Sequence, residues 1–291
     1  MPTVGVRTPL LLAQLTDTHI VPPDTTEELF VDNNGRLAAA VASIEREHPG
    51  MDAVLATGDL VNDASPVEYA VLSQLVASLN VPFLPIPGNH DDRDLMRSTF
   101  PDMPWVDAEH ASWVTTVRGG TVDGEARTLR IVGLDSTIPG QPGAEFDGDR
   151  EHWLRTVLAS DRDVPTVLAM HHPPFSTGIA WMDEAGFVGL DQLIGVLHEF
   201  PVLRVMSGHL HRPITSSVAG ITAQVCLSTV QQIDLDLAPG AGMSLILDPV
   251  GYQIHRVGGP HDRPNIASHT RFIETGEAAF VPGWDDAAPA G

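Results

Sequence analysis

The sequence predicts an α/β fold built from two mixed β-sheets that pack together under helices. Short apolar runs alternate with amphipathic stretches as far as about residue 210, and this alternation of strand and helix patterns is typical of α/β proteins. Two pairs of strand-like segments flank short turns and break the rhythm, which adds antiparallel hairpins. With 291 residues, 43% of them hydrophobic, the chain is long and apolar enough to bury a sizeable core.

Local patterns place the individual elements. Residues 36–47 carry apolar side chains at helical spacing. Ser65 followed by Pro66 and Glu68 is typical of a helix start with a capping box, and this helix is expected to end near residue 79. The other expected elements are strands at 10–15, 53–57, 81–86, 166–170, 203–206, 243–247 and 252–257, helices at 93–99, 149–159 and 187–199, and hairpins that join 113–117 to 129–134 and 214–218 to 221–226.

Charge and composition narrow the classes of partner. The formal net charge of −22 disfavours nucleic-acid polymers and anionic membranes as partners, so an anionic substrate would need a bound cation to hold it. Cys226 is the only cysteine, which excludes an internal disulfide and a cysteine zinc site, and we expect it in the core. The first apolar run is too short to span a membrane and reads as a strand, not a signal peptide. A soluble, cytoplasmic protein is expected.

Polar turns follow five of the predicted strands and contain nearly all of the Asp, Asn and His residues of interest. These turns are residues 17–19, 58–59, 88–91, 171–172 and 208–211. In α/β sheets, ligands bind at the carboxyl ends of the strands. We therefore expect the five turns to converge on one place.

Their side chains are suitable metal ligands. Asp17 and His19 are two residues apart, as are His209 and His211, so on an extended backbone each pair would point to one face and grip one ion. Carboxylate and imidazole without thiolate suit Mn, Fe, Co, Zn or Ni better than calcium. The seven candidate ligands are Asp17, His19, Asp59, Asn89, His171, His209 and His211, which is more than one ion would use. Two metals that share a carboxylate fit this number and could activate water for attack at phosphorus.

In this order, the five turns resemble the motifs of the calcineurin-like metallophosphoesterases. The resemblance spans residues 17 to 211 and is strongest for the bacterial subgroup of class III cyclic-nucleotide phosphodiesterases and glycerophosphodiesterases. It rests on Gly-Asn-His-Asp-Asp at 88–92, His-His-Pro-Pro at 171–174 and Trp-Met-Asp at 181–183. The family fold is a four-layer α/β/β/α sandwich, which agrees with two sheets under helices.

The resemblance implies a role for each residue. Asp17, His19 and His211 would bind the first of two divalent or trivalent ions (Mn, Fe, Zn or Co), Asn89, His171 and His209 would bind the second, and Asp59 would bridge both. His90 would not be a ligand but would face the phosphate, stabilise the transition state or protonate the leaving oxygen, with Asp91 holding its ring. Asn89, His90 and His209 are expected to contact the substrate.

Most single features also have an ordinary structural explanation. A lone Asp-x-His or Gly-Asp is common turn chemistry, so only the ordered combination indicates a metal site. Adjacent strand residues face opposite ways, and His172 is therefore expected to be structural. Asn62 and Asp63 either orient the loop of Asp59 or lead into the cap at Ser65. The remaining histidines are expected to face solvent; they are His48, His110, His152, His198, His255, His261 and His269.

The resulting prediction is a binuclear phosphodiesterase that acts by in-line attack of a metal-bridging hydroxide. Its expected substrates are small phosphodiesters, with 3′,5′-cyclic nucleotides such as cAMP first and glycerophosphodiesters or a broad range of diesters as the alternative. A phosphoprotein phosphatase and a non-catalytic metal-binding interaction module are the remaining alternatives.

Residues 1–258 are expected to form the catalytic domain. Residues 259–291 would be a partly ordered tail, and this tail, residues 20–32 and residues 175–187 are candidates for substrate contacts. The tail or the second hairpin could also support a homo-oligomer.

Overall fold

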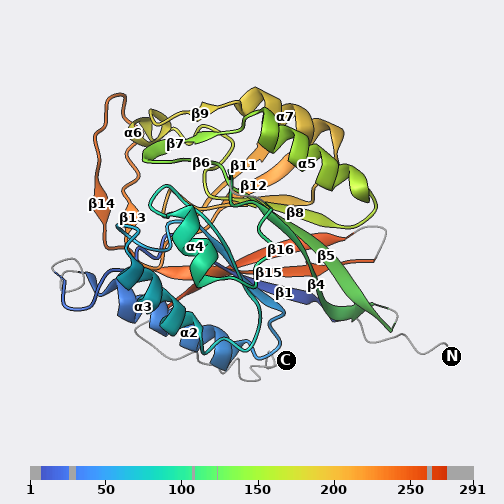
Figure 1. Ribbon diagram of the computed structural model, residues 1–291, viewed down its shortest axis with the longest axis horizontal. Coiled ribbons are helices and arrows are strands. Elements are labelled where there is room, and N and C mark those ends of the chain that lie inside the picture. Colours follow the sequence, from blue (N-terminus) through green and yellow to red (C-terminus); the bar gives the residue numbers. More distant parts are fainter. Residues whose placement is uncertain (1–7, 26–30, 107–108, 123, 261–263, 274–291) are drawn as a thin grey trace, which may run out of the picture.

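The computed structural model has two β-sheets that lie face to face, with helices against both outer faces (Figure 1). It describes residues 8–25, 31–106, 109–122, 124–260 and 264–273. The five-stranded sheet has the order β16-β15-β1-β2-β3 and the six-stranded sheet the order β11-β12-β10-β8-β5-β4. No helix within the described ranges combines the length and the apolar character needed to cross a bilayer.

The elements of the five-stranded sheet and its helices are β1 (Leu10–Leu15), α2 (Asn33–Glu47), β2 (Ala53–Thr57), α3 (Pro66–Val76), β3 (Phe83–Ile86), α4 (Arg93–Thr99), β15 (Gly251–Gly258) and β16 (Asn265–Phe272). Those of the six-stranded sheet and its helices are β4 (Trp113–Val122), β5 (Glu125–Leu134), α5 (Gly148–Ser160), β8 (Thr166–Met170), α7 (Leu190–Glu199), β10 (Arg204–Ser207), β11 (Ile214–Val218) and β12 (Ile221–Val225). Smaller elements are β6 (Thr137–Ile138), β7 (Gln141–Glu145), α6 (Ala180–Asp183), β9 (Phe187–Val188), β13 (Gln232–Ile233) and β14 (Leu245–Ile246).

Three buried clusters hold these layers together. Between the sheets, alternate residues of β1 (Leu10 and Leu12) pack with Val167 and Met206 of the opposite sheet. A second cluster joins α2 and α3 to the outer face of the five-stranded sheet, and a third joins α5 and α7 to the outer face of the six-stranded sheet. The four-layer α/β/β/α sandwich is therefore confirmed.

The strand directions bring the five polar turns to one edge. β1, β2 and β3 run parallel in one sheet, and β5, β8 and β10 run parallel in the other. The turns after β1, β2 and β3 carry the ligands of the first sheet, and those after β8 and β10 carry the ligands of the second. The two halves of the expected site therefore belong to different sheets.

Local signals set several boundaries. Ser65 caps α3 through the Glu68 backbone N–H, and the Glu68 side chain accepts from the Ser65 backbone, which completes the predicted capping box. The helix expected at 187–199 begins only at Leu190, because Gly189 has a φ of 77° and the preceding residues pair with β7 as β9. The strand expected at 243–247 is reduced to β14, which pairs with β13 in a separate two-stranded sheet.

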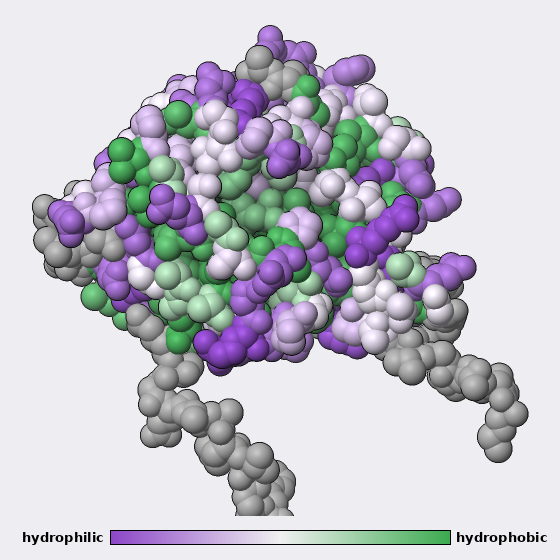
Figure 2. All heavy atoms as spheres, turned by 60° about the horizontal axis from the view of Figure 1, so that its bottom comes forward, coloured by the Kyte–Doolittle hydropathy of each residue, from purple (hydrophilic) through white to green (hydrophobic). Residues whose placement is uncertain are grey.

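The carboxyl-terminal part continues the five-stranded sheet beyond residue 258. β16 pairs with β15 from Asn265 to Phe272 and forms the edge of the sheet. The remainder of the expected tail, together with His261 and the middle of the 20–32 segment, lies outside the described residues. Figure 2 turns the α2 and α3 side of Figure 1 toward the reader, and hydrophilic side chains gather around the edges of this face.

Candidate metal centre

The structure brings the predicted ligands together at the carboxyl edge of the two sheets. Side chains of three groups have ligand atoms that lie within 4.8 Å of one another. The groups are Asp17 with His19 and His211, Asp17 with Asp59 and His171, and His171 with His172 and His209. Because the second group shares Asp17 with the first and His171 with the third, the three groups form one continuous cluster.

The ligand turns use left-handed backbone instead of the extended backbone that we expected. The φ angles are 50° at Asp17, 39° at His19, 50° at Asp59, 72° at His209 and 54° at His211. Non-glycine residues rarely adopt this region, although Asp and His do so more readily than most. His209 and His211 fall in different groups.

Three side chains form the first group. Nε2 of His19 lies 3.1 Å from Nε2 of His211, which in turn lies 3.6 Å from Oδ1 of Asp17. All three side chains are buried. Nδ1 of His211 bonds to the carbonyl oxygen of Gln231 at 3.0 Å, which directs Nε2 toward the centre.

Asp59 and Asn89 both lie next to the ring of His171. Nε2 of His171 lies 3.3 Å from Oδ2 of Asp59 and 3.1 Å from Oδ1 of Asn89. The same Asp59 oxygen lies 3.9 Å from Nε2 of His19, so this carboxylate stands between His171 and the first group. Nδ1 of His171 bonds to the Thr57 carbonyl at 2.8 Å. The position of Asp59 is the one that a bridging ligand needs.

Glycines let the turns approach closely. A Cβ atom at Gly88 would lie 2.2 Å from Oδ1 of Asp59, and one at Gly208 would lie 2.0 Å from Oγ1 of Thr16. These two glycines therefore make room for the bridging carboxylate and for the turn that precedes Asp17, in addition to ending their strands.

Burial and mutual charge set the protonation of the histidines. Burial lowers the pKa values of His19 and His209 to about 3, aided by repulsion from neighbouring imidazoles. Burial alone would also lower the pKa of His171, but the Asp59 carboxylate outweighs it and raises that pKa to about 9. The same pairing holds the pKa of Asp59 well below its ordinary value despite burial. His19 and His209 thus have free lone pairs at neutral pH.

The donor set fits two metal ions. The six predicted Asp and His ligands lie in three overlapping groups, Asn89 lies beside His171, and Cys226 is buried elsewhere, between Gln14 and Leu227. The buried His and Asp groups are consistent with a binuclear metal site, and ligands of this kind accept several first-row metals.

His90 lies beside the cluster, but its ring partner differs from the expected one. Nδ1 of His90 bonds to the Asn62 carbonyl at 2.7 Å, and the His90 backbone N–H donates to Oδ1 of Asp59 at 2.8 Å. The Asp91 carboxylate instead accepts from the backbone N–H groups of Leu60 and Gly88. Asp91 therefore holds the two turns together, and burial followed by repulsion from Asp59 raises its pKa to about 7.

Other histidines divide between structural and surface positions. His172 is buried, and its ring bonds to Oγ of Ser136 and the carbonyl of Pro142, which supports the structural role expected for it. The expectation of solvent exposure is wrong for His110 and His255, which are buried in hydrogen-bonded positions. His110 lies in the segment before β4, and His255 lies on β15, where a polar residue on the inner face of a strand looks like a surface residue in sequence.

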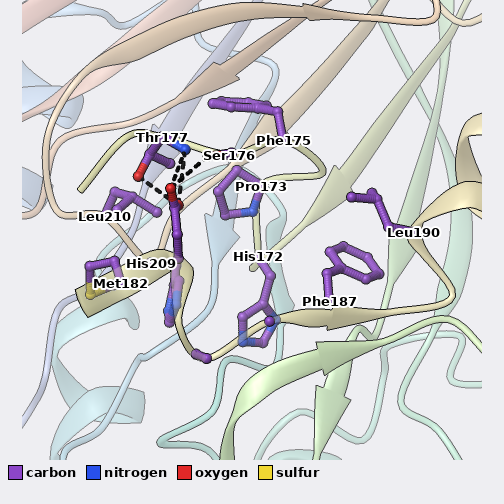
Figure 3. A pocket seen from close by; sticks show the side chains of 13 residues that line it. His172, Pro173, Phe175, Ser176, Thr177, Met182, Phe187, Leu190, His209 and Leu210 are labelled. Atoms are coloured by element: carbon purple, nitrogen blue, oxygen red, sulfur yellow. Dashed lines mark hydrogen bonds between the residues drawn. The ribbon is translucent and has the colours of Figure 1, made fainter. Parts of the chain in front are cut away.

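Cavities adjoin the cluster on several sides. One of about 300 Å³ is lined by His19, Asp59, Asn89, His90, His209 and His211 and also by Ile233, Trp181, Met182, Met243 and Leu245. A second, of about 520 Å³, lies beside Asn89 and His90 and is lined mainly by polar residues. A third, of about 150 Å³, lies where His172 and His209 meet Phe175, Phe187 and Leu190 (Figure 3).

Sequence reasoning found only part of this lining. Trp181 and Met182 belong to the 175–187 segment that was expected to contact substrate, and Asp183 fixes this segment by accepting bonds from Ser176, Thr177 and Gly178. β13 and its pairing with β14 were missed. Its signal is the alternation of apolar and acidic residues from 233 to 237, which ordinary strands share.

Comparisons with known proteins agree with this geometry. The family described as calcineurin-like phosphoesterase matches residues 10–213. A probable glycerophosphodiester phosphodiesterase GpdQ of Arcobacter nitrofigilis is 29% identical over 93% of this chain and 96% of its own. A probable cyclic nucleotide phosphodiesterase of Rhodococcus erythropolis is 33% identical over 79% of this chain and 74% of its own. The 3′,5′-cyclic adenosine monophosphate phosphodiesterase CpdA of Pseudomonas aeruginosa is 31% identical over 70% of each chain.

Solved structures share the fold at low identity. A dimetal phosphatase from Danio rerio has a TM-score of 0.60 at 13% identity and covers 90% of this chain and 98% of its own. A purple acid phosphatase from yellow lupin has a TM-score of 0.64 at 14% identity and covers 96% of this chain and 54% of its own. Since the family match covers most of the sequence and includes all five ligand turns, the chain belongs to the calcineurin-like phosphoesterase family.

Proposed function

We propose that the protein is a metal-dependent phosphodiesterase whose preferred substrates are 3′,5′-cyclic nucleotides, cAMP above all. The observation that carries the proposal is a cavity lined both by the ligand cluster and by an apolar wall. We define this wall as Trp181, Met182, Met243 and Leu245, which line the same cavity as His19, Asp59 and His211. A purine base offers a flat apolar face for such a wall, while its phosphate would lie at the cluster.

The bound metal ions, His90 and Asn89 would act around the phosphate. Two metal ions bound by the cluster would lower the pKa of a water molecule and neutralise charge on the phosphate. The Asn62 carbonyl holds Nδ1 of His90, so Nε2 is the atom of this ring that is available to the substrate. In the imidazolium form of His90, Nε2 can donate its proton to the leaving oxygen, which leaves the neutral ring with Nδ1–H on Asn62. The Asn89 side-chain oxygen lies 3.1 Å from Nε2 of His171, which holds its amide in place.

Glycerophosphodiesters are a second candidate because of the polar cavity beside Asn89 and His90. A linear diester has two separate alcohol arms, and a cavity of about 520 Å³ that these residues line could hold the second arm. A cyclic nucleotide has both ester oxygens on one ribose and does not need this space. A GpdQ relative also aligns over most of the chain.

A substrate panel combined with elemental analysis tests the proposal. The purified protein, loaded with Mn²⁺, is given cAMP, glycerophosphocholine, bis-p-nitrophenyl phosphate and the monoester p-nitrophenyl phosphate. We expect two metal ions per chain and the highest kcat/KM for cAMP. A higher value for glycerophosphocholine would replace the substrate assignment, and hydrolysis of the monoester alone would indicate a phosphatase. Two bound ions without any hydrolysis would favour a metal-binding interaction module. Self-association of the chain stays a prediction.

A further inference from the structure

A buried polar residue interrupts the apolar face of β1 directly below the metal centre. Leu10 and Leu12 point into the core between the two sheets, and Gln14 continues this alternation with a fully buried amide. Burial of an amide in such a core requires hydrogen-bond partners. The partners of Gln14 reach both halves of the site.

The amide nitrogen of Gln14 joins the ends of two ligand strands. It donates to Oγ1 of Thr57 at 2.9 Å and to the carbonyl oxygen of Ser207 at 3.0 Å. Thr57 ends β2 and precedes Gly58 and Asp59, whereas Ser207 ends β10 and precedes the turn of His209. These strands belong to different sheets, so one side chain connects the turns that carry the two halves of the cluster.

The amide oxygen of Gln14 has a partner of its own. It lies 2.9 Å from Nε2 of His255, and Nδ1 of the same ring lies 2.8 Å from Oγ of Ser268. Because the amide nitrogen already donates twice, the oxygen must accept from Nε2–H, which leaves Nδ1 to accept from the Ser268 hydroxyl. Arg204 donates to Ser268 at 2.9 Å. The chain of bonds therefore starts on β10 and returns to β10 through Gln14.

From this arrangement we propose that Gln14 is a positioning residue that ties the Asp59 and His209 turns together across the two sheets, with His255 orienting its amide. Thr57 extends the effect to a ligand, since its carbonyl oxygen accepts from Nδ1 of His171. Neither Gln14 nor His255 touches the cavity of the metal centre. The inference rests on the proposed binuclear centre but not on the identity of the substrate.

Two measurements test this role: the affinity of the protein for metal, and the electron paramagnetic resonance spectrum of the two bound ions. Gln14→Leu keeps the size of the side chain but removes its three bonds, and loss of an outer partner of a metal site typically lowers affinity by about 10- to 100-fold. We expect the full-length variant to bind Mn²⁺ that much more weakly at one or both sites in equilibrium dialysis. We also expect the electron paramagnetic resonance spectrum of the protein loaded with two Mn²⁺ to differ from that of the wild type, because the coupling of the two ions depends on their separation.

A pair of His255 variants separates positioning from simple destabilisation. His255→Gln keeps a donor near the position of Nε2 and should retain wild-type affinity and spectrum, whereas His255→Leu should reproduce the Gln14→Leu defect. Ser43→Ala is the matched control, since it removes a buried 2.9 Å bond to the Tyr252 hydroxyl on the helix side of the same sheet. It should leave metal binding unchanged.

The outcomes distinguish the inference from the proposed function. If the wild type does not bind two ions, the binuclear centre itself is refuted. If the wild type binds two ions and both Gln14→Leu and His255→Leu match its affinity and spectrum, Gln14 has no positioning role. If Gln14→Leu does not fold, the His255 pair decides, and equal behaviour of His255→Gln and His255→Leu overturns the inference.

Discussion

Nε2 of His171 lies 3.3 Å from Oδ2 of Asp59, across the boundary between the two sheets. The histidine follows β8 of the six-stranded sheet, and the aspartate follows β2 of the five-stranded sheet. The metal centre is therefore complete only when both sheets are packed. Asp59 is the residue that lies next to both His171 and His19.

Replacement of Asp59 by Asn should empty both metal sites. The amide keeps the shape of the carboxylate but loses the charge that two cations would share, and even the loss of an outer partner typically costs 10- to 100-fold in affinity or activity. We expect a loss of more than about 100-fold in kcat/KM for bis-p-nitrophenyl phosphate, together with low metal content by elemental analysis. Near-normal turnover with an empty site would contradict the assignment.

His90→Gln should slow hydrolysis without removing metal. His90 is held by Asn62 and reaches the cluster through its backbone N–H, so its ring is free to act on the substrate. Loss of a positioned proton donor typically costs about 100-fold or more in rate. Single-turnover rates and metal content measure the two effects separately. Loss of one metal ion in this variant would make His90 a ligand.

Trp181→Ala tests the apolar wall. Stacking of a base on an aromatic side chain contributes about 1–3 kcal/mol, so kcat/KM for cAMP should fall by roughly 5- to 100-fold. The value for glycerophosphocholine should change much less, because glycerol has no flat apolar surface. Trp153→Ala in α5 is the control, since Trp153 packs in the helical layer and does not line the cavity. Equal losses for both substrates would show that Trp181 does not recognise a base.

Metal binding should release a proton from His171. In the metal-free protein, Asp59 raises the pKa of this imidazole to about 9, so at pH 7 it carries a proton that a metal must displace. The affinity of the metal-free protein for Mn²⁺ should therefore rise with pH up to about 9 and then level off. Calorimetry in buffers of different ionisation enthalpy counts the protons. Affinity that does not depend on pH between 7 and 9 would exclude this protonated state.

His255 should make the protein less stable in acid. Burial lowers its pKa from 6.5 to about 3, so below pH 6.5 the unfolded chain binds a proton that the folded protein does not. This contribution to stability is complete above pH 6.5 and is lost as the pH falls, by about 2 kcal/mol at pH 5. His255→Gln should lose this part of the pH dependence in urea unfolding measured at pH 7 and pH 5. An unchanged difference would show that His255 is protonated in the folded state.

The sequence was informative wherever a local signal decides the structure. The Ser65 capping box, the apolar strands and the polar residues at their carboxyl ends predicted the layers and the one edge at which the seven candidate ligands lie. Parallel strands in one sheet share an edge, so little more than their alternation with helices was needed.

Features that depend on tertiary packing could not be predicted in this way. His255 looks like a surface residue in sequence because its partners, Gln14 and Ser268, lie 241 and 13 residues away along the chain. The ring of His90 was expected to bond to its neighbour Asp91, but the fold offers the Asn62 carbonyl instead. Short β14 was overestimated, since a run of apolar residues does not reveal whether a sheet is nearby to receive it.

The left-handed backbone at Asp17 and Asp59 implies a trade-off between stability and function. At such φ angles, a side chain costs the folded state free energy that glycine would not, roughly 1 kcal/mol for each residue. Glycine at Asp17 would relax the turn, but it would delete a ligand and the carboxylate that accepts from the His209 backbone N–H and the Thr16 hydroxyl. The folded protein therefore keeps strained backbone at the turns that carry its candidate metal ligands.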